Sequence, residues 1–131
     1  EITRGTFAYT NHTLLPEALE PWPVATFERL LPRHLQIVYL INRDFLKAAA
    51  ERFPDDHGRF ERLSIIDENH GRQVRMSHLA VVGSRKVNGV AKLHSELMTK
   101  TIFAELARMF PERFTNVTNG IAVRRWLKQS N

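Results

Sequence analysis

The sequence has 131 residues, 43% of them hydrophobic and 25% charged, which is the length and composition of one globular domain with a hydrophobic core. Nineteen Lys and Arg against fourteen Asp and Glu give a net charge of +5, and the absence of cysteine excludes disulfides, thiolate metal sites and cysteine nucleophiles. No apolar run reaches the roughly 18 residues that a membrane span needs, so no membrane contact is expected. The absence of cysteine fits a cytoplasmic location.

The first predicted elements are a short buried strand over 7–10, a turn over 11–13 and a helix from Pro16 through Glu20. His12 therefore lies where a strand gives way to a helix. In α/β proteins ligands bind at the carboxyl ends of strands, so this histidine is a candidate ligand contact. Half-buried histidines are also common as hydrogen-bonded structural residues, and the local pattern leaves both interpretations of His12 open.

Two further helices are expected over 24–31 and from Pro32 to about Phe53. Apolar residues recur every three or four positions along the longer helix and predict one buried stripe, formed by Leu35, Val38, Ile41, Phe45, Ala49 and Phe53. Polar residues between them are expected to face solvent, namely Arg33, Asn42, Arg43 and Lys47.

The middle of the chain predicts a helical turn over 59–63 and a β-hairpin whose strands, 64–66 and 74–76, are joined through a turn at 69–71. Ser77 is expected to cap a helix that ends near Val82.

After that helix, Asn88-Gly89 has the composition of a turn. One or two helices follow, marked by Val90, Leu93, Leu97, Phe103, Leu106 and Phe110. A strand is expected over 114–118, and Asn119-Gly120 then predicts a tight turn. The predicted fold class is mostly α with one β-hairpin and short strands.

Several function classes receive no support from the residues. The six histidines have no HExxH spacing, and no GxSxG, Walker A or paired glycine-rich motif is present, so no metal site and no self-sufficient hydrolase, kinase or dehydrogenase is expected. Most arginines alternate with acids, which is typical of a solvated, ion-paired helix face. A basic nucleic-acid-binding module is still a rival hypothesis, although no nucleic-acid partner is expected.

A last constellation lies near the C-terminus, where Asn119-Gly120 precedes Arg124, Arg125 and Trp126. A turn that exposes backbone amides, two cations and a flat aromatic could hold a sugar or a phosphorylated ring. The same residues also suit a turn followed by a helix that buries Trp126 and solvates both arginines.

Three long sequence words, in this order, resemble matching blocks of one family: FAYTNHTLLPEALEPWP, SRKVNGVAKLHSEL and RFTNVTNGIAVRRWL. The family is that of the α-glucan phosphorylases, the glycogen and maltodextrin phosphorylases, of bacterial type, and the resemblance covers nearly the whole chain. It implies an internal fragment, 1–131, that forms the C-terminal section of the N-terminal domain in a two-domain α/β (GT-B type) fold.

The resemblance also implies substrate-binding roles. His12 would be the catalytic-site residue whose backbone carbonyl faces the reacting glucose, and Asn119 would hydrogen-bond the same sugar. Thr13 and Ala18 would border a small pocket beside the anomeric face. The implied reaction is phosphorolysis of terminal α-1,4 glucosyl units by inorganic phosphate, with glucose 1-phosphate as the product.

The implied cofactor is pyridoxal phosphate, with Val90 and Trp126 near its ring and its attachment lysine outside this chain. Near this implied cofactor site, the sequence differs at two places from the segments that are usual in the family. Ala122-Val123 lacks the proline that starts the next helix in the family, and Arg85-Lys86 stand where histidine and a small residue are common.

A fragment of this kind is expected to be inactive alone and to self-associate through surfaces near Tyr9, Trp22, Trp126 and Leu127. The parent is expected to be a homodimer. The rival to the phosphorylase interpretation is a stand-alone glucan-binding module without catalysis.

Overall fold

The computed structural model describes residues 2–56, 58–69 and 71–130. Helices dominate this part of the chain. They are α1 (Ile2–Thr6), α2 (Val24–Leu30), α3 (Pro32–Arg52), α4 (Gly58–Leu63), α5 (Met76–Val82), α6 (Lys92–Lys100), α7 (Ala104–Met109) and α8 (Val123–Ser130), with 3-10 turns η1 (Pro16–Ala18) and η2 (Pro111–Arg113).

The strands form two small sheets. Sheet A is parallel, with the order β1 (Ala8–Thr10), β5 (Lys86–Gly89), β6 (Phe114–Asn116). Sheet B is antiparallel, with the order β2 (Pro21–Pro23), β4 (Gln73–Arg75), β3 (Ile66–Asp67). The described chain is thus mostly helical with small sheets, as the sequence predicts.

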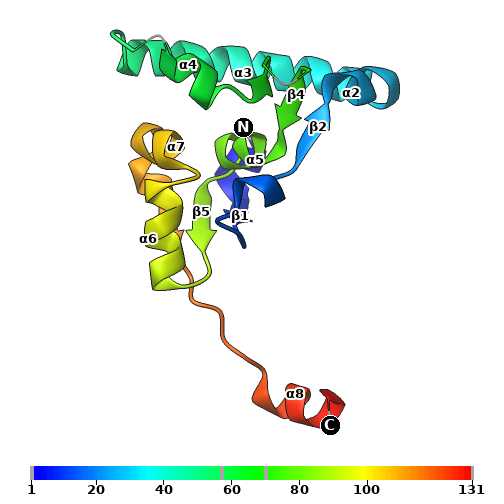
Figure 1. Ribbon diagram of the computed structural model, residues 1–131, viewed down its shortest axis with the longest axis vertical. Helices are drawn as coiled ribbons and strands as arrows, with labels where there is room; N and C mark the ends of the chain where they lie inside the picture. Colours follow the sequence, from blue (N-terminus) through cyan, green and yellow to red (C-terminus); the bar gives the residue numbers. More distant parts are fainter. Residues whose placement is uncertain (1, 57, 70, 131) are drawn as a thin grey trace.

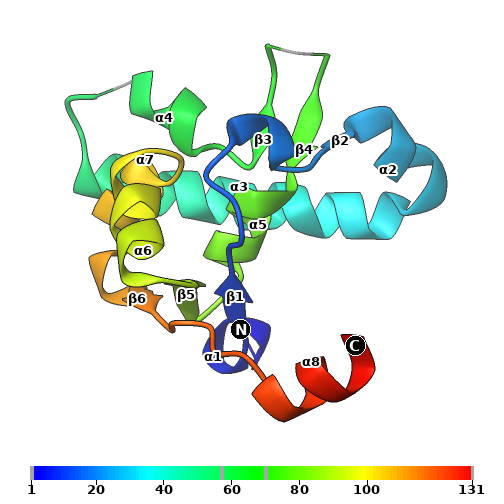
Figure 2. The same cartoon turned by 60° about the horizontal axis from the view of Figure 1, so that its bottom comes forward.

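Figure 1 shows α3 lying across one end of the molecule with α2 and α4 beside it, while α6 and α7 flank sheet A. Figure 2 shows the same arrangement, with α8 set apart from the body in both views. A single cluster of buried apolar side chains connects α3 to the rest, and it includes Leu63, Ile65, Val74, Val81, Val87, Met98, Phe103 and Leu106. Among the described residues, no helix is both long and apolar enough to cross a bilayer.

The amphipathic pattern of α3 is confirmed at Leu35, Val38, Phe45 and Ala49, which are buried. Asn42, expected in solvent, is instead 9% exposed. Its side-chain oxygen accepts a hydrogen bond from the Ile65 amide (2.8 Å), so the residue that breaks the apolar stripe satisfies a buried backbone donor.

Most other helix predictions are confirmed within one or two residues, and two local details are wrong. The helix expected from Pro16 through Glu20 is only the single turn η1, and Glu20 lies outside it. Ser77 is not the cap of α5, because the helix begins one residue earlier and Ser77 is buried inside its first turn.

Two predicted turns are also wrong. Asn88-Gly89 forms the end of β5, the central strand of sheet A, because both neighbouring strands supply it with hydrogen-bond partners. The Asn88 side chain is satisfied there by the Thr10 hydroxyl, which donates to its oxygen at 2.9 Å. Asn119-Gly120 forms no tight turn either, since the segment between β6 and α8 has no regular structure.

The predicted hairpin is confirmed as β3 and β4, which pair antiparallel at Ile66 and Val74. His70, placed in its turn by the sequence, lies outside the described residues. No pattern in the sequence predicts β2, where Trp22 pairs with Val74 on the other side of β4. Two prolines flank Trp22, and prolines are accepted only on an edge strand, which β2 is.

Candidate functional site

The carboxyl edge of sheet A gathers three of the predicted site residues. His12 follows β1, Val90 follows β5 and Asn119 follows β6 after two intervening residues. Because the three strands are parallel and adjacent, their carboxyl ends meet at one edge, which is where open α/β sheets bind ligands. In Figure 1 the arrow of β5 points from α5 toward the side on which α8 lies.

Backbone hydrogen bonds continue past the ends of the strands and hold these residues together. The Asn11 amide donates to the Asn88 carbonyl (3.0 Å), and the Asn119 amide donates to the Val90 carbonyl (2.9 Å). Val117 likewise donates to Gly89 (3.1 Å). The edge is therefore a continuation of the sheet, and its geometry is more rigid than that of a free loop.

A side-chain turn places His12 on the surface. Asn11 is 1% exposed, and its oxygen accepts a hydrogen bond from the Thr13 amide (3.2 Å), as in an Asx turn. The Thr13 hydroxyl then accepts from Leu15 (3.0 Å), so this hydroxyl is already engaged within the loop. His12 between them is exposed.

The His12 carbonyl oxygen and the Asn119 side-chain amide are among the polar groups at this edge that have no hydrogen-bond partner within the described part of the chain. A carbonyl and an amide without an internal partner, on exposed residues at the end of a parallel sheet, are available to hydroxyl groups of a bound ligand. Neither has to break an internal hydrogen bond in order to bind.

Close packing of α6 on β5 supports this edge. A Cβ built on Gly89 would lie 2.4 Å from Ser95 Oγ and 2.8 Å from Ser95 Cα, so only glycine allows this approach. The Val90 amide donates to His94 Nδ1 (3.1 Å), and the Ser95 hydroxyl donates to the Asn116 oxygen (2.9 Å). The sequence pattern does not identify Gly89, His94 and Ser95 as supporting residues. Their contacts depend on Asn88-Gly89 belonging to the strand β5, whereas the sequence predicts a turn there.

The other predicted site residues are not brought into packed contact with this edge. Ala18 is exposed on η1. Trp126 is 56% exposed on α8, so the expectation of a core tryptophan does not hold in this chain. Figure 1 shows why, because an extended segment carries α8 away from the body. Among the described residues, no group of three or more possible metal ligands is arranged to hold an ion.

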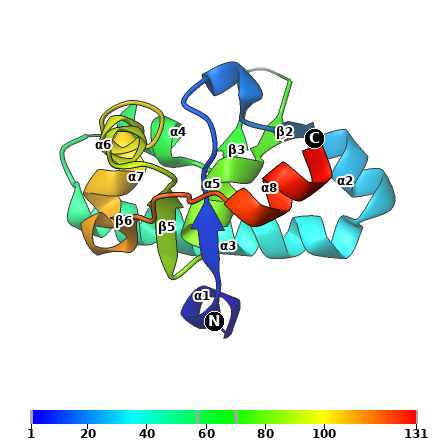
Figure 3. The ribbon, with the colours of Figure 1, turned by 90° about the horizontal axis from the view of Figure 1, so that it is seen from below.

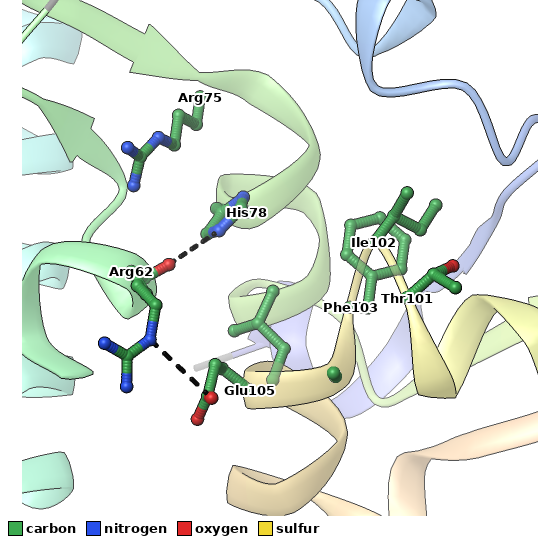
Figure 4. Close-up of a pocket in the computed structure, with 9 residues that line it drawn as sticks. Arg62, Arg75, His78, Thr101, Ile102, Phe103 and Glu105 are labelled. Carbon is green, nitrogen blue, oxygen red and sulfur yellow. Dashed lines mark hydrogen bonds and ion pairs between the residues drawn. The ribbon is translucent and has the colours of Figure 1, made fainter.

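A separate hollow of about 430 Å³ lies between α4, α5 and the start of α7. Figure 4 shows Arg62, Arg75, His78, Phe103 and Glu105 around it. Glu105 is shared by Arg59 (2.9 Å) and Arg62 (3.7 Å). None of the predicted site residues lines this hollow.

His78 on the wall of this hollow is held in its neutral form. Its Nε2 donates to the Arg62 carbonyl (3.2 Å), and its Nδ1 is buried without a partner among the described groups. Burial, with the positive charge of Arg75, lowers the His78 pKa to about 4, although the Arg62 carbonyl and Asp67 act in the opposite direction. Its ring packs edge-on against the buried Phe103.

The fold places this chain in a class first: it is a mostly helical section of a domain, with a small parallel sheet whose carboxyl edge is a candidate ligand site. A family model described as carbohydrate phosphorylase matches residues 1–131. The chain therefore belongs to the carbohydrate phosphorylase family.

Individual relatives are glycogen phosphorylases. The chain is 58% identical to the glycogen phosphorylase of Saccharomyces cerevisiae (strain ATCC 204508 / S288c), over 100% of this chain and 15% of that protein. It is 53% identical to the liver form of Bos taurus and to the brain form of Homo sapiens, over 100% of this chain and 15% and 16% of those proteins. The chain thus spans about 15% of the length of these relatives.

Proposed function

We propose that this chain is part of a glycogen or α-glucan phosphorylase, a hexosyltransferase that releases glucose 1-phosphate from terminal α-1,4-linked glucosyl units with inorganic phosphate. The observation that carries the proposal is the pair of unbonded polar groups, the His12 carbonyl and the Asn119 amide, at the carboxyl edge of sheet A. Whole-chain identity to enzymes named glycogen phosphorylase supports it. The chain would be the C-terminal section of the N-terminal domain of a GT-B type fold.

The two groups suit the chemistry of this reaction. Glycosyl transfer passes through an oxocarbenium-like state, in which positive charge develops at the sugar ring. The His12 carbonyl oxygen stabilises positive charge and does not compete as a nucleophile, and the Asn119 amide orients a sugar hydroxyl. Thr13 and Ala18 would form the border of the glucose subsite.

The residues assigned to the cofactor suit a flat ring. Val90 offers a half-buried aliphatic side chain and Trp126 an exposed aromatic face, and neither brings a charged group that would compete with the ring's substituents. Pyridoxal phosphate, when bound to a lysine elsewhere in the parent, would supply a phosphate group able to relay a proton. Val90, at the carboxyl edge of sheet A, would pack against the ring.

The test of this assignment is Asn119→Ala in the full-length parent. It should reduce the catalytic efficiency of phosphorolysis by the equivalent of about 1 to 3 kcal/mol, because a hydroxyl of the reacting sugar is left without its hydrogen-bond partner. Glucose 1-phosphate release from glycogen measures the effect. His12→Ala should act equally or less, since the backbone carbonyl survives the substitution.

The matched control is Asn69→Ala, the same substitution on the exposed β3–β4 hairpin, which should leave the kinetics unchanged. Wild-type kinetics in both the His12 and Asn119 variants would exclude the site assignment. Phosphorolysis by the isolated 131-residue chain would contradict the proposal that it supplies only one wall of the site.

The isolated chain should self-associate, and the parent is proposed to be a cytoplasmic homodimer. The α8 residues Trp126 and Leu127 are 56% and 62% exposed, and Trp22 is 40% exposed. Tyr9 is not part of this surface, because it is half-buried with its ring against Phe103. Exposed apolar surface of this kind favours association between copies.

Sedimentation equilibrium should show dimers or larger species of the isolated chain at micromolar concentration. A variant with Trp126→Ser and Leu127→Ser should shift the population toward monomer. Leu93→Ser, which removes an equally exposed apolar residue from α6, should not. A wild-type chain that stays monomeric at high micromolar concentration would contradict the proposed association.

A further inference from the structure

A second pocket lies at the amino edge of sheet A, opposite to the candidate glucan site. It has a volume of about 310 Å³ and is lined by Arg4, Arg85, Lys86, Glu112 and Arg113. Its residues lie at or before the amino ends of the three strands: Arg4 is in α1, which precedes β1, Lys86 begins β5, and Arg113 directly precedes β6. Figure 3 shows α1 at the amino end of β1.

The charge in this pocket is unbalanced. Four cationic side chains face one carboxylate, that of Glu112, which is 70% exposed and 3.9 Å from Arg113. Arg4 and Arg85 make no side-chain hydrogen bond or ion pair with any residue that the structure describes. By contrast, Arg59 and Arg75 are paired with Glu105 and Asp67 within 3.0 Å.

Arg113 is fixed in place before any ligand arrives. Its side chain is 14% exposed and lies over the Phe110 ring at 3.7 Å. One terminal nitrogen, Nη1, donates to the carbonyls of Val82 and Ser84, each at 3.2 Å. Burial, followed by repulsion from Arg4, lowers the Arg113 pKa, while Glu112 acts in the opposite direction.

Lys86 is also held, because its Nζ donates to the Glu112 backbone carbonyl at 2.6 Å. Two prepositioned cations therefore stand beside two unpaired guanidinium groups, which can turn toward a ligand. Several guanidinium forks and an ammonium group match the oxygens of a tetrahedral anion. The pocket is small, and elsewhere on the surface acidic residues alternate with the basic ones. Both features favour a small anion over a polymeric one.

We propose that the amino-edge pocket of sheet A, formed by Arg4, Arg85, Lys86 and Arg113, binds a small phosphate-bearing anion. The ligand is inorganic phosphate or a phosphate monoester. Because the pocket lies at the opposite edge from His12 and Asn119, it is separate from the proposed phosphorolysis site.

The test is an NMR titration of the isotope-labelled 131-residue chain with inorganic phosphate and, separately, with phenyl phosphate, at pH 7.5 and constant ionic strength set by chloride. The signals of the arginine Nε–H groups and of the 85–86 amides should move and saturate. The double variant Arg85→His with Lys86→Ala should weaken the affinity at least about tenfold, since charge-assisted hydrogen bonds are removed.

The matched control removes the same charge from α8, by Arg124→His with Arg125→Ala, and should keep the wild-type affinity. Lys86→Arg, which retains the charge, should also bind. Saturable binding of inorganic phosphate would identify the free anion as a ligand of the pocket. Saturable binding of phenyl phosphate alone would identify the ligand as a phosphate monoester. Shifts spread over all surface cations, an equal loss in both double variants, or saturation by neither anion would overturn the proposal. No readout depends on phosphorolysis.

Discussion

Replacing Phe103 with alanine should lower the free energy of unfolding by about 3 to 5 kcal/mol, because the surrounding core cannot close over the lost ring. Phe103 is 1% exposed and begins the turn into α7. The rings of Tyr9, His78 and Phe114 surround it, at centroid distances of 6.3, 6.5 and 6.3 Å. These three residues belong to β1, α5 and β6, so one side chain joins sheet A to the helices.

Chemical denaturation at low protein concentration measures this effect. The matched control is Leu93→Ala on the neighbouring helix α6, where the side chain is 66% exposed and the expected change is within about 0.5 kcal/mol. Equal stabilities of the two variants would show that Phe103 does not hold the two parts together.

Acidification from pH 7 to pH 4 should lower the free energy of unfolding through His78 by about 3 kcal/mol, because each pKa unit is worth about 1.4 kcal/mol. The folded protein has a His78 pKa of about 4, against 6.5 in the unfolded chain. Between these values the unfolded chain binds a proton that the folded chain does not. The stabilisation is therefore complete above pH 6.5 and is lost as the pH falls toward 4.

His78→Gln isolates this contribution, because glutamine can still donate an N–H to the Arg62 carbonyl and does not titrate. Unfolding free energies of the variant and the wild type are compared at pH 8 and pH 4.5, so that all other titrating groups cancel. The wild type should lose more stability than the variant. Identical losses in the two proteins would mean that His78 is already charged in the folded state.

The sequence predicts the helices of this protein well where burial is periodic. The stripe from Leu35 to Ala49 needs only one apolar face, and that information is present within α3 itself. It does not predict Asn42, whose burial depends on the Ile65 amide from a distant segment. A polar residue inside an amphipathic helix is recognisable as buried only when its partner is known.

Sheet A shows the limit of local patterns more clearly. Asn88-Gly89 has the composition of a turn, but the pairing of Thr10 with Asn88 and of Gly89 with Asn116 makes it the end of the central strand. The position of His12 at a strand end was predictable from its own segment. Its placement at the same edge as Asn119 was not, because the order of parallel strands depends on contacts between distant segments.

The parallel pairing of β1 with β5 also has a kinetic consequence. Thr10 and Asn88 meet across 78 residues, whereas β3 and β4 pair within one hairpin. Closing the longer loop costs more chain entropy before any contact compensates for it, so the hairpin and the α2–α3 pair should form early and sheet A late. During synthesis on the ribosome, β1 cannot pair until β5 has been synthesised. The edge that carries His12 is therefore assembled near the end of folding, and until then the unpaired β1 is open to misassociation.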